Sequence, residues 1–247
     1  MTPKASIVVP AYNEGEQIVR ALDDLFASVE TPCEVLVVYD TAEDTTAPFA
    51  EEYARRDPRV RPTLNTYGRG PAKAIRFGMD NALADVIVVT MADGSDEQSK
   101  IDTMVGLVEG GAAVVAASRY MSGGRQIGGP VLKRLLSRTA GVSLYWLART
   151  GTHDPTNSFK AYSKRFIEQA GIESEAGFEI GLELVAKARR MRARVVEIPA
   201  TWRDRTSGSS NFKLAAWLKH YLRWYAYAFG PKLDAGSRPS HARRQDA

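Results

Sequence analysis

Residues 86–100 read VIVVTMADGSDEQSK, and this stretch indicates the fold class. The β-branched run at its start predicts a strand buried on both faces, and the acidic residues after it predict a turn. In an open α/β sheet the residues just beyond a strand's carboxyl end face the ligand crevice, so Asp93 is expected to contact a ligand. Asp93 and Ser95 share one face of an extended segment, and such oxygen ligands suit Mg²⁺ beside a diphosphate. An Asp-Gly turn that caps the next helix explains the same residues equally well.

The composition is that of a globular protein. The chain has 247 residues, 44% of them hydrophobic and 25% charged, enough for one large domain or one domain with an appendage. Its single cysteine, Cys33, excludes an internal disulfide, disfavours a cysteine zinc site and fits a reducing compartment. The formal charge is only +4, but lysine and arginine recur through the second half, which suits an anionic partner such as phosphate, lipid headgroup or nucleic acid. We expect no export signal, and no stretch has the roughly 20 apolar residues of a spanning helix.

β-branched runs alternate with amphipathic stretches through the first half of the chain. This alternation predicts βαβ units, and hence an α/β fold with a largely parallel sheet. The expected strands are residues 6–9, 34–39, 86–91 and 113–117, and the expected helices are residues 16–29, 43–56, 72–84 and 100–109. Neither G-x-G-x-x-G nor G-x-x-x-x-G-K-[ST] follows the first strand, which disfavours a dinucleotide oxidoreductase or a P-loop enzyme.

Three polar or glycine-rich segments are candidate ligand loops. Residues 39–46 place carboxylates and hydroxyls after the second strand, where such groups either bind a base or ribose or cap the next helix. Residues 65–71 contain two glycines and a proline suited to a helix start, as in a phosphate loop or a plain connector. Residues 121–130 contain four glycines and no apolar periodicity, and we expect a mobile lid there.

Cationic residues mark two segments of the second half. Lys133 and Ser137 are i,i+4 neighbours on a predicted helix, with Arg134 adjacent; this pattern suits an anion but is more commonly a solvated basic face. Residues 203–211, RDRTSGSSN, interleave two arginines with hydroxyls, and we expect this loop to wrap an anion rather than to be a plain surface loop. His153 has no partner at metal-ligand spacing and is given no role.

Residues 212–230 form a predicted amphipathic helix. A basic face opposes a face of aromatic residues and leucines, which favours a helix in a membrane interface over one packed on its own domain. The basic face carries Lys213, Lys219, His220 and Arg223, and the other face carries Leu214, Trp217, Leu218, Tyr221, Leu222, Trp224 and Tyr225. The expected organisation is a folded domain at 1–211, this interfacial helix at 212–230 and a disordered tail at 231–247.

Seven motifs follow one another along the chain. They are IVVPAYNE at 7–14, VVYDTAEDTT at 37–46, TMADGSDE at 90–97, SRY at 118–120, KRLLSR at 133–138, DPTNSFKAY at 154–162 and EIPATWRDRTSGSS at 197–210. In this order they resemble inverting family 2 glycosyltransferases of the GT-A fold, above all the dolichol-phosphate mannose synthase branch. The resemblance implies that residues 1–211 are a GT-A catalytic domain, a Rossmann-like, mostly parallel sheet flanked by helices.

The resemblance also implies roles for individual positions. Those that would hold the donor nucleotide are Pro10, Tyr12, Glu14, Asp40 and Asp93. Those that would hold the acceptor phosphate are Arg119, Lys133, Arg134 and Ser137. Asp93 and Ser95 would bind Mg²⁺ or Mn²⁺, and catalysis would depend on Asp93, Arg119 and Arg205. Four further motif positions have no assigned role: Asp154, Glu183, Gly208 and Ser210.

Three positions depart from the family pattern. Met91 replaces the first aspartate of D-x-D, so metal binding would depend on Asp93 with Ser95 or with Asp96. Lys133 stands where relatives usually carry arginine, which keeps the charge but loses the bidentate fork. Asn211 stands where a lysine often follows the serine.

The resemblance implies transfer of a hexose, with inversion, from GDP-mannose or a UDP-hexose to a polyprenyl phosphate. The enzyme would be peripheral, at the cytoplasmic face of the membrane, and a membrane-anchoring subunit or a homo-oligomer is compatible with it. A phosphate monoester is already largely anionic at neutral pH, so no strong base is required. The cations are not interleaved with an aromatic platform, so we expect no nucleic-acid binding.

Two alternatives remain open at this point. A glycosyltransferase acting on a glycan or lipid hydroxyl would need a general base, for which Asp154 or Asp96 is the candidate. A catalytically silent nucleotide-sugar-binding scaffold is compatible with Met91 in place of an aspartate.

Overall fold

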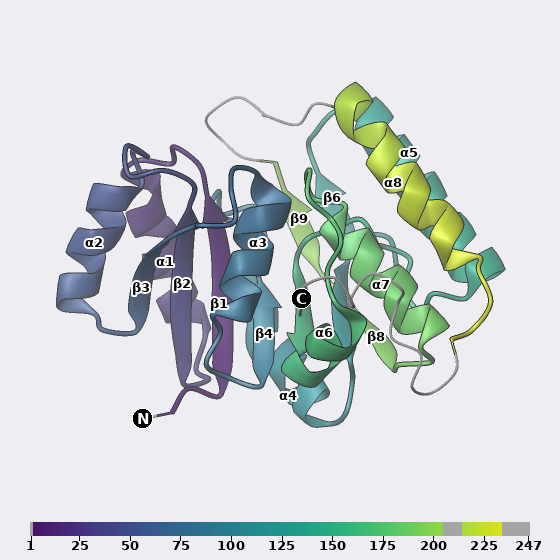
Figure 1. The fold of residues 1–247 in the computed structure, drawn as a ribbon, viewed down its shortest axis with the longest axis horizontal. Coiled ribbons are helices and arrows are strands. Elements are labelled where there is room, and N and C mark those ends of the chain that lie inside the picture. The colour runs from purple at the N-terminus through teal and green to yellow at the C-terminus, as the bar shows by residue number, and fades with distance from the viewer. Residues whose placement is uncertain (1, 205–213, 234–247) are drawn as a thin grey trace, which may run out of the picture.

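A computed structural model describes residues 2–204 and 214–233 of the chain. Seven strands form one sheet in the order β3-β2-β1-β4-β7-β5-β8 (Figure 1). They are β1 (Ala5–Ala11), β2 (Cys33–Tyr39), β3 (Val60–Leu64), β4 (Val86–Val89), β5 (Val114–Ser118), β7 (Lys160–Ser163) and β8 (Val195–Pro199). A second, two-stranded sheet pairs β6 (Arg125–Ile127) with β9 (Thr201–Arg203) in parallel.

Helices cover both faces of the large sheet. The α-helices are α1 (Gln17–Ser28), α2 (Ala47–Arg56), α3 (Pro71–Asp80), α4 (Ile101–Glu109), α5 (Val131–Ser143), α6 (Lys164–Ala170), α7 (Ile180–Arg190) and α8 (Leu214–Ala228). A short 3-10 helix, η1 (Gln98–Lys100), precedes α4, and a π-helix, η2 (Leu144–Ala148), continues α5. Buried side chains of α1, α2 and α4 pack on one face, and those of α3, α6 and α7 pack on the other.

The strand direction determines where the candidate residues lie. β1 is parallel to β2 and β4, β2 is parallel to β3, and β5 is parallel to β8. β7 is antiparallel to both of its neighbours, β4 and β5. The six parallel strands therefore end at one edge of the sheet, and β7 begins at that same edge.

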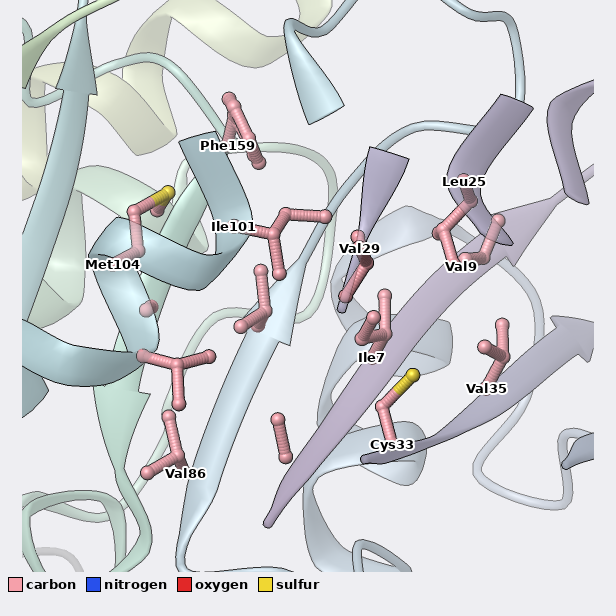
Figure 2. Close-up of a cluster of buried hydrophobic side chains, with 14 of the residues drawn as sticks. Ile7, Val9, Leu25, Val29, Cys33, Val35, Val86, Ile101, Met104 and Phe159 are labelled. Atoms are coloured by element: carbon pink, nitrogen blue, oxygen red, sulfur yellow. The ribbon is translucent and has the colours of Figure 1, made fainter. Parts of the chain in front are cut away.

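The β-branched runs form the two-sided core that their sequence predicts. All residues of β1, β2, β4 and β5 are buried. Figure 2 shows part of the core on the α1 and α4 side, where Ile7 and Val9 of β1 lie in one cluster with Leu25, Ile101 and Met104. Burying apolar surface on both faces of the central strands is the main favourable contribution to this fold.

The predicted strands and helices of the first half are confirmed to within a few residues, but β3, β6, β7 and β9 were not expected. β3 has the sequence VRPTL and is an edge strand that is only partly buried. It was not predicted because its arginine and proline interrupt the apolar pattern of a strand. β7 has four residues and follows a polar loop. The lid expected at 121–130 is wrong in part, because residues 125–127 form β6 and are paired with β9.

The C-terminal helix α8 packs on the domain through part of its aromatic face. Trp224 is 1% exposed and lies in a cluster with Leu144 of η2 and Leu182 of α7. Ser143 Oγ and Tyr225 OH are 2.9 Å apart, and Arg223 Nη2 donates to Glu173 Oε2 at 2.6 Å. Leu218 and Leu222 remain exposed, so the expected apolar face is divided between the protein and solvent.

The described part of the chain has no helix that is both long and apolar enough to cross a bilayer. The expected tail at 231–247 lies outside the described residues from position 234 onward.

Two glycines in helix interiors provide a test of the packing. A Cβ added at Gly78 of α3 would lie 2.4 Å from Val8 Cγ1 of β1, whereas one at Gly106 of α4 would meet nothing within 4 Å. We expect Gly78→Ala to lower the free energy of unfolding by about 1–3 kcal/mol through overpacking. Gly106→Ala should raise it by about 0.5–1 kcal/mol through helix propensity. Urea denaturation measures both, and equal effects of the two changes would contradict the α3–β1 contact.

Candidate active site

The site lies at the edge where the parallel strands end. Pro10 is buried within β1, while Tyr12 and Glu14 follow that strand, with Tyr12 exposed. The turn at 12–14 is held from α2's side, because the Asp44 carboxylate accepts from Asn13 N at 3.1 Å and Thr46 Oγ1 accepts from Glu14 N at 3.0 Å. The turn after β1 is thus fixed, and it carries the exposed side chain of Tyr12.

Asp40, after β2, shapes the next loop. Its Oδ1 accepts from Asn65 Nδ2 at 2.8 Å, and its Oδ2 accepts from Gly70 N at 2.8 Å. Gly70 has φ +118°, a conformation that glycine adopts without strain. Asp40 therefore holds the 65–70 loop in place. The sequence reasoning did not include Asn65, although it lies in a loop already marked by its two glycines.

Asp93 lies at the end of β4, half-buried, as the sequence predicts for a ligand-facing carboxylate. Its Oδ1 accepts from Ser95 N at 3.1 Å, and Ser95 itself is buried. Asp96, the alternative metal ligand, is engaged elsewhere: its Oδ2 accepts from Thr90 Oγ1 at 3.1 Å and from Met91 N at 3.0 Å. Burial raises the pKa of Asp96 to about 7. Asp96 thus stabilises the turn that presents Asp93.

This donor set suits a hard divalent cation that also binds substrate. Within residues 2–204 and 214–233, no three His, Cys, Asp or Glu side chains come together as a metal site. One reachable carboxylate at a sheet edge nevertheless fits Mg²⁺, which keeps several waters and binds through one or two carboxylates together with phosphate oxygens. Such an ion would therefore be bound jointly by Asp93 and a diphosphate.

Strand β9 supports the Asp93 turn from the other side. Arg203 N donates to Ser95 O at 3.0 Å, and Thr201 N donates to Glu97 Oε2 at 2.6 Å. Asp204 N then donates to Ile127 O of β6 at 2.9 Å. Arg205 is the next residue, and it lies outside the described residues together with Gly208 and Ser210.

Arg119 follows β5 and forms a buried ion pair with Asp154. Arg119 Nε donates to Asp154 Oδ2 at 2.7 Å, and Nη2 donates to Oδ1 at 2.8 Å. The backbone N of Arg119 also donates to Oδ2, at 3.0 Å. Burial alone would raise the pKa of Asp154, but the Arg119 guanidinium outweighs it and the pKa is lowered. An ionised carboxylate already engaged in this way is poorly suited to act as a general base.

Ser137 joins α5 to this pair. Arg119 Nη2 lies 3.3 Å from Ser137 Oγ, which is 2.6 Å from Thr156 Oγ1. Lys133 lies one helical turn before Ser137 on α5, half-buried, and Arg134 is exposed beside it. The structure therefore brings Arg119 and Ser137 together and places the two predicted basic residues on the same helix.

A buried lysine supports the loop that carries Asp154. Lys160 Nζ at the start of β7 donates to Pro155 O at 3.1 Å and also to Asn157 O. Burial lowers the pKa of Lys160 to about 7. From the sequence, Asp154 was only a candidate general base for the alternative reaction and Lys160 had no role, because a carboxylate and a lysine six residues apart do not show which partner each meets.

His153, to which the sequence gave no role, has a structural one. Its Nδ1 lies 2.6 Å from Glu197 Oε1 of β8, its ring stacks on Tyr145 of η2 with centroids 3.6 Å apart, and its backbone N donates to Glu197 Oε2. These contacts hold the polar loop through β8 and η2.

The pKa of Lys160 gives a testable pH dependence. Between pH 7 and its unfolded-state pKa near 10.5, the unfolded chain binds a proton at this lysine that the folded chain does not, so the native state gains stability as pH rises. We expect the free energy of unfolding of the wild type to rise relative to Lys160→Met between pH 7 and 10, by up to about 1.4 kcal/mol per pH unit. Chemical denaturation over this range measures the difference. If the free energies of unfolding of the wild type and of Lys160→Met changed in parallel with pH, the lowered pKa of Lys160 would be contradicted.

Comparison with known proteins identifies the family of this site. Residues 6–171 match the model of Glycosyl transferase family 2. The polyprenol monophosphomannose synthase of Mycolicibacterium smegmatis is 30% identical over 235 residues, which cover 87% of this chain and 87% of that protein. The dolichol-phosphate mannosyltransferase of Pyrococcus furiosus is 30% identical over 232 residues, which cover 89% of this chain and 63% of that protein. The undecaprenyl-phosphate mannosyltransferase of Micrococcus luteus is 31% identical over 212 residues, 82% of this chain and 85% of that protein.

Solved structures agree on the fold. Glucosyl-3-phosphoglycerate synthase from Mycobacterium tuberculosis, in complex with Mn²⁺, UDP and glucosyl-3-phosphoglycerate, has a TM-score of 0.65 at 17% identity and covers 94% of this chain and 82% of its own. Mannosyl-3-phosphoglycerate synthase from Rubrobacter xylanophilus has a TM-score of 0.67 at 15% identity, with 91% and 72% covered. The expected GT-A fold is confirmed. This chain belongs to glycosyl transferase family 2.

Proposed function

We propose that this protein transfers a hexose, with inversion, from a nucleotide sugar to a polyprenyl phosphate. The observation that carries the proposal is the acceptor side of the site, where Arg119 meets Ser137 beside the basic start of α5. The carboxylates nearby, Asp154 and Asp96, are already engaged in hydrogen bonds. A phosphate monoester needs orienting cations and hydroxyls rather than a base, because it is already largely anionic at neutral pH. A hydroxyl acceptor would need the base that this arrangement does not offer.

The names of the relatives support the same acceptor class. All three curated relatives are named for mannose transfer or mannose synthesis on polyprenol, dolichol or undecaprenyl phosphates. These names favour mannose as the sugar, with GDP-mannose as the first donor to test and UDP-hexoses after it. The product would be a polyprenyl-phosphate sugar.

The nucleotide sugar would bind to the residues that follow β1 and β2 and to the turn that contains Asp93. Tyr12 and Glu14 would contact the nucleotide, and Asp40 would act by holding the 65–70 loop against it. Asp93, with Ser95 as the second predicted ligand, would hold Mg²⁺ or Mn²⁺; a structural neighbour was crystallised with Mn²⁺ and UDP. The bound ion would supply Lewis-acid stabilisation of the departing diphosphate.

The chain's own cations orient the acceptor. Arg119 and Ser137 would bind the lipid phosphate for in-line attack, with Lys133 and Arg134 adding charge from α5 and Arg205 adding charge near the diphosphate. Positioning of this kind supplies a large part of the rate when the nucleophile needs no activation. Inversion follows from a single displacement at the anomeric carbon.

An exposed apolar surface on α5, η2 and α8 would face the membrane beside the proposed acceptor site. We define the apolar rim as the exposed large apolar residues of α5, η2 and α8, which are Val131, Leu132, Leu135, Leu136, Trp146, Leu147, Leu218 and Leu222. Trp146 is 69% exposed and Leu135 is 59% exposed, and exposed apolar side chains gathered in this way are typical of an interaction site. The helices that carry it lie together at one side of the molecule (Figure 1). The rim would seat the protein peripherally on the cytoplasmic face of the membrane, where a prenyl tail is accessible; an anchoring subunit or a second copy would cover part of it.

The function is tested by turnover with a panel of donors. Purified protein is incubated with Mg²⁺ or Mn²⁺, polyprenyl phosphate and labelled GDP-mannose or UDP-hexoses, and lipid-linked product is extracted. We expect product that disappears with EDTA, and a fall in kcat of about 100-fold or more for Asp93→Asn. Asp85→Asn makes the same change just before β4, at the opposite edge of the sheet, and should leave kcat unaltered. No product from any donor would overturn the proposal, and nucleotide binding without turnover would favour a silent scaffold.

The apolar rim is tested separately by binding to vesicles. We expect the double variant Leu135→Gln/Trp146→Gln to reduce co-sedimentation with anionic phospholipid vesicles at least tenfold, since each buried apolar side chain contributes about 1.5–3 kcal/mol. Leu83→Gln removes a leucine that is 61% exposed at the far edge of the sheet and serves as the control. Equal binding by the double variant and the control would assign membrane attachment to another surface.

A further inference from the structure

Asp154 has no role in the proposed reaction as described so far, although it is completely buried beside Arg119. Its side chain is 0% exposed, and that of Arg119 is 11% exposed. Removing two charges from water is costly unless the geometry of the pair is good and the remaining hydrogen bonds are satisfied. Because burying the Arg119–Asp154 ion pair carries this desolvation penalty, we looked for a functional role of the pair.

The hydrogen bonds of Asp154 fix both the position and the plane of the Arg119 guanidinium. The two oxygens of Asp154 accept from Nε and Nη2 of Arg119, and Oδ2 also accepts from the backbone N of Arg119. A bidentate pair of this kind defines the plane of the guanidinium as well as its distance. Among the described residues, Nη1 is the guanidinium nitrogen of Arg119 that makes no hydrogen bond, and its donors are the ones that an acceptor phosphate would meet.

Two hydroxyls extend this pair to α5. Thr156 Oγ1 lies 3.5 Å from Asp154 Oδ1 and 2.6 Å from Ser137 Oγ, and Ser137 Oγ lies 3.3 Å from Arg119 Nη2. The four residues form a closed ring from three segments: the end of β5, the start of the 154–157 loop, and α5. The ring therefore sets the position of Arg119 relative to the helix that carries Lys133 and Arg134.

The charge of Asp154 also acts on two buried basic groups. Lys160 Nζ is buried below the same loop, and Arg119 and Asp154 both act on its charge. Without the carboxylate, the buried Arg119 guanidinium would lose its counter-charge, and the remaining buried neighbour, Lys160, would not replace it. We expect Arg119 to move away from the site in that case, because a rotated arginine reaches solvent more readily than a lysine fixed by two carbonyl groups.

We infer that Asp154 is a positioning residue for the acceptor, acting through Arg119. It fixes Arg119 so that Nη1 and the Ser137 hydroxyl face one phosphate, and it takes no proton in the reaction. The inference deepens the proposed function and rests on it, since it supposes an anionic acceptor at Arg119.

The kinetic test is a double-mutant cycle of Asp154→Asn and Arg119→Lys. Asparagine keeps the size of the side chain but cannot accept from both Nε and Nη2. We expect Asp154→Asn to raise the KM for polyprenyl phosphate at least tenfold and to leave the KM for the nucleotide sugar within about twofold. In the Arg119→Lys background, Asp154→Asn should cause less than a further twofold change, because lysine cannot form the bidentate pair.

Glu197→Gln is the matched control. Glu197 holds the same loop through His153 and does not touch Arg119, so this variant should leave the KM for the acceptor unaltered. A similar rise in that KM for Glu197→Gln would mean that any loosening of the loop suffices, and would overturn the inference. The inference would also be overturned if Asp154→Asn and Arg119→Lys had independent, additive effects on the KM for the acceptor. A loss of kcat at unchanged acceptor KM, with loss of the acidic limb of the pH–rate profile, would make Asp154 a general base instead.

A readout that does not need turnover separates the inference from the proposed function. In ¹⁵N-labelled protein, the Nε–H resonance of Arg119, assigned by its loss in Arg119→Lys, should be sharp and protected from exchange in the wild type and in Glu197→Gln. It should broaden or exchange rapidly in Asp154→Asn. A protected resonance in a protein that makes no lipid-linked product would refute the proposed function while supporting the positioning by Asp154. If the Arg119 Nε–H resonance stayed sharp and protected in Asp154→Asn, the claim that Asp154 positions Arg119 would be refuted.

Discussion

The reversed direction of one short strand determines how this site is assembled. Six strands of the large sheet are parallel and end at the same edge, and β7 is inserted between β4 and β5 in the opposite direction. Its first residue, Lys160, therefore lies at the edge where β4 and β5 end. The loop before it delivers Asp154 to Arg119 after β5, on the side of β7 away from Asp93. Asp93 and Arg119, the proposed metal ligand and acceptor residue, thus follow the two strands that flank β7, and sheet geometry fixes the separation of those strands.

Several ionisable side chains of the site are buried, and each of them has a partner that accepts or donates a hydrogen bond. Asp154 is balanced by Arg119 and influenced by Lys160, while Asp96 accepts hydrogen bonds inside the turn that presents Asp93. Burial acts in opposite directions on the acids and the lysine, raising the pKa of Asp96 and lowering that of Lys160. The interior therefore carries little net charge, whereas the cations of α5 remain outside it. In the proposed reaction this arrangement would attract an anionic acceptor, and the buried carboxylates would take no part in the chemistry.

Much of the fold could be predicted from the sequence, because the central strands are continuous β-branched runs separated by amphipathic helices. Asp93 at the end of β4 and Arg119 at the end of β5 follow from the same pattern and the polarity of α/β sheets. β7 could not be predicted, since KAYS is too short for periodicity, and its antiparallel pairing depends on which neighbours leave a gap. The partnership of Arg119 with Asp154, 35 residues apart, depends on that insertion and was missed for the same reason. The division of α8 into packed and exposed apolar residues depends on α7 and η2, which a helical wheel does not include.

The central claim is that donor and acceptor bind on either side of β7, with the cation at Asp93 and the acceptor phosphate at Arg119. The most direct test is anomalous diffraction from crystals grown with Mn²⁺, a nucleoside diphosphate and a short-chain prenyl phosphate. The account predicts one manganese peak at about 2.0–2.3 Å from an Asp93 oxygen, which also touches the diphosphate, and a prenyl phosphate bound by Arg119 Nη1 and Ser137 Oγ. A manganese ion held away from Asp93, or a prenyl phosphate bound without Arg119, would contradict it.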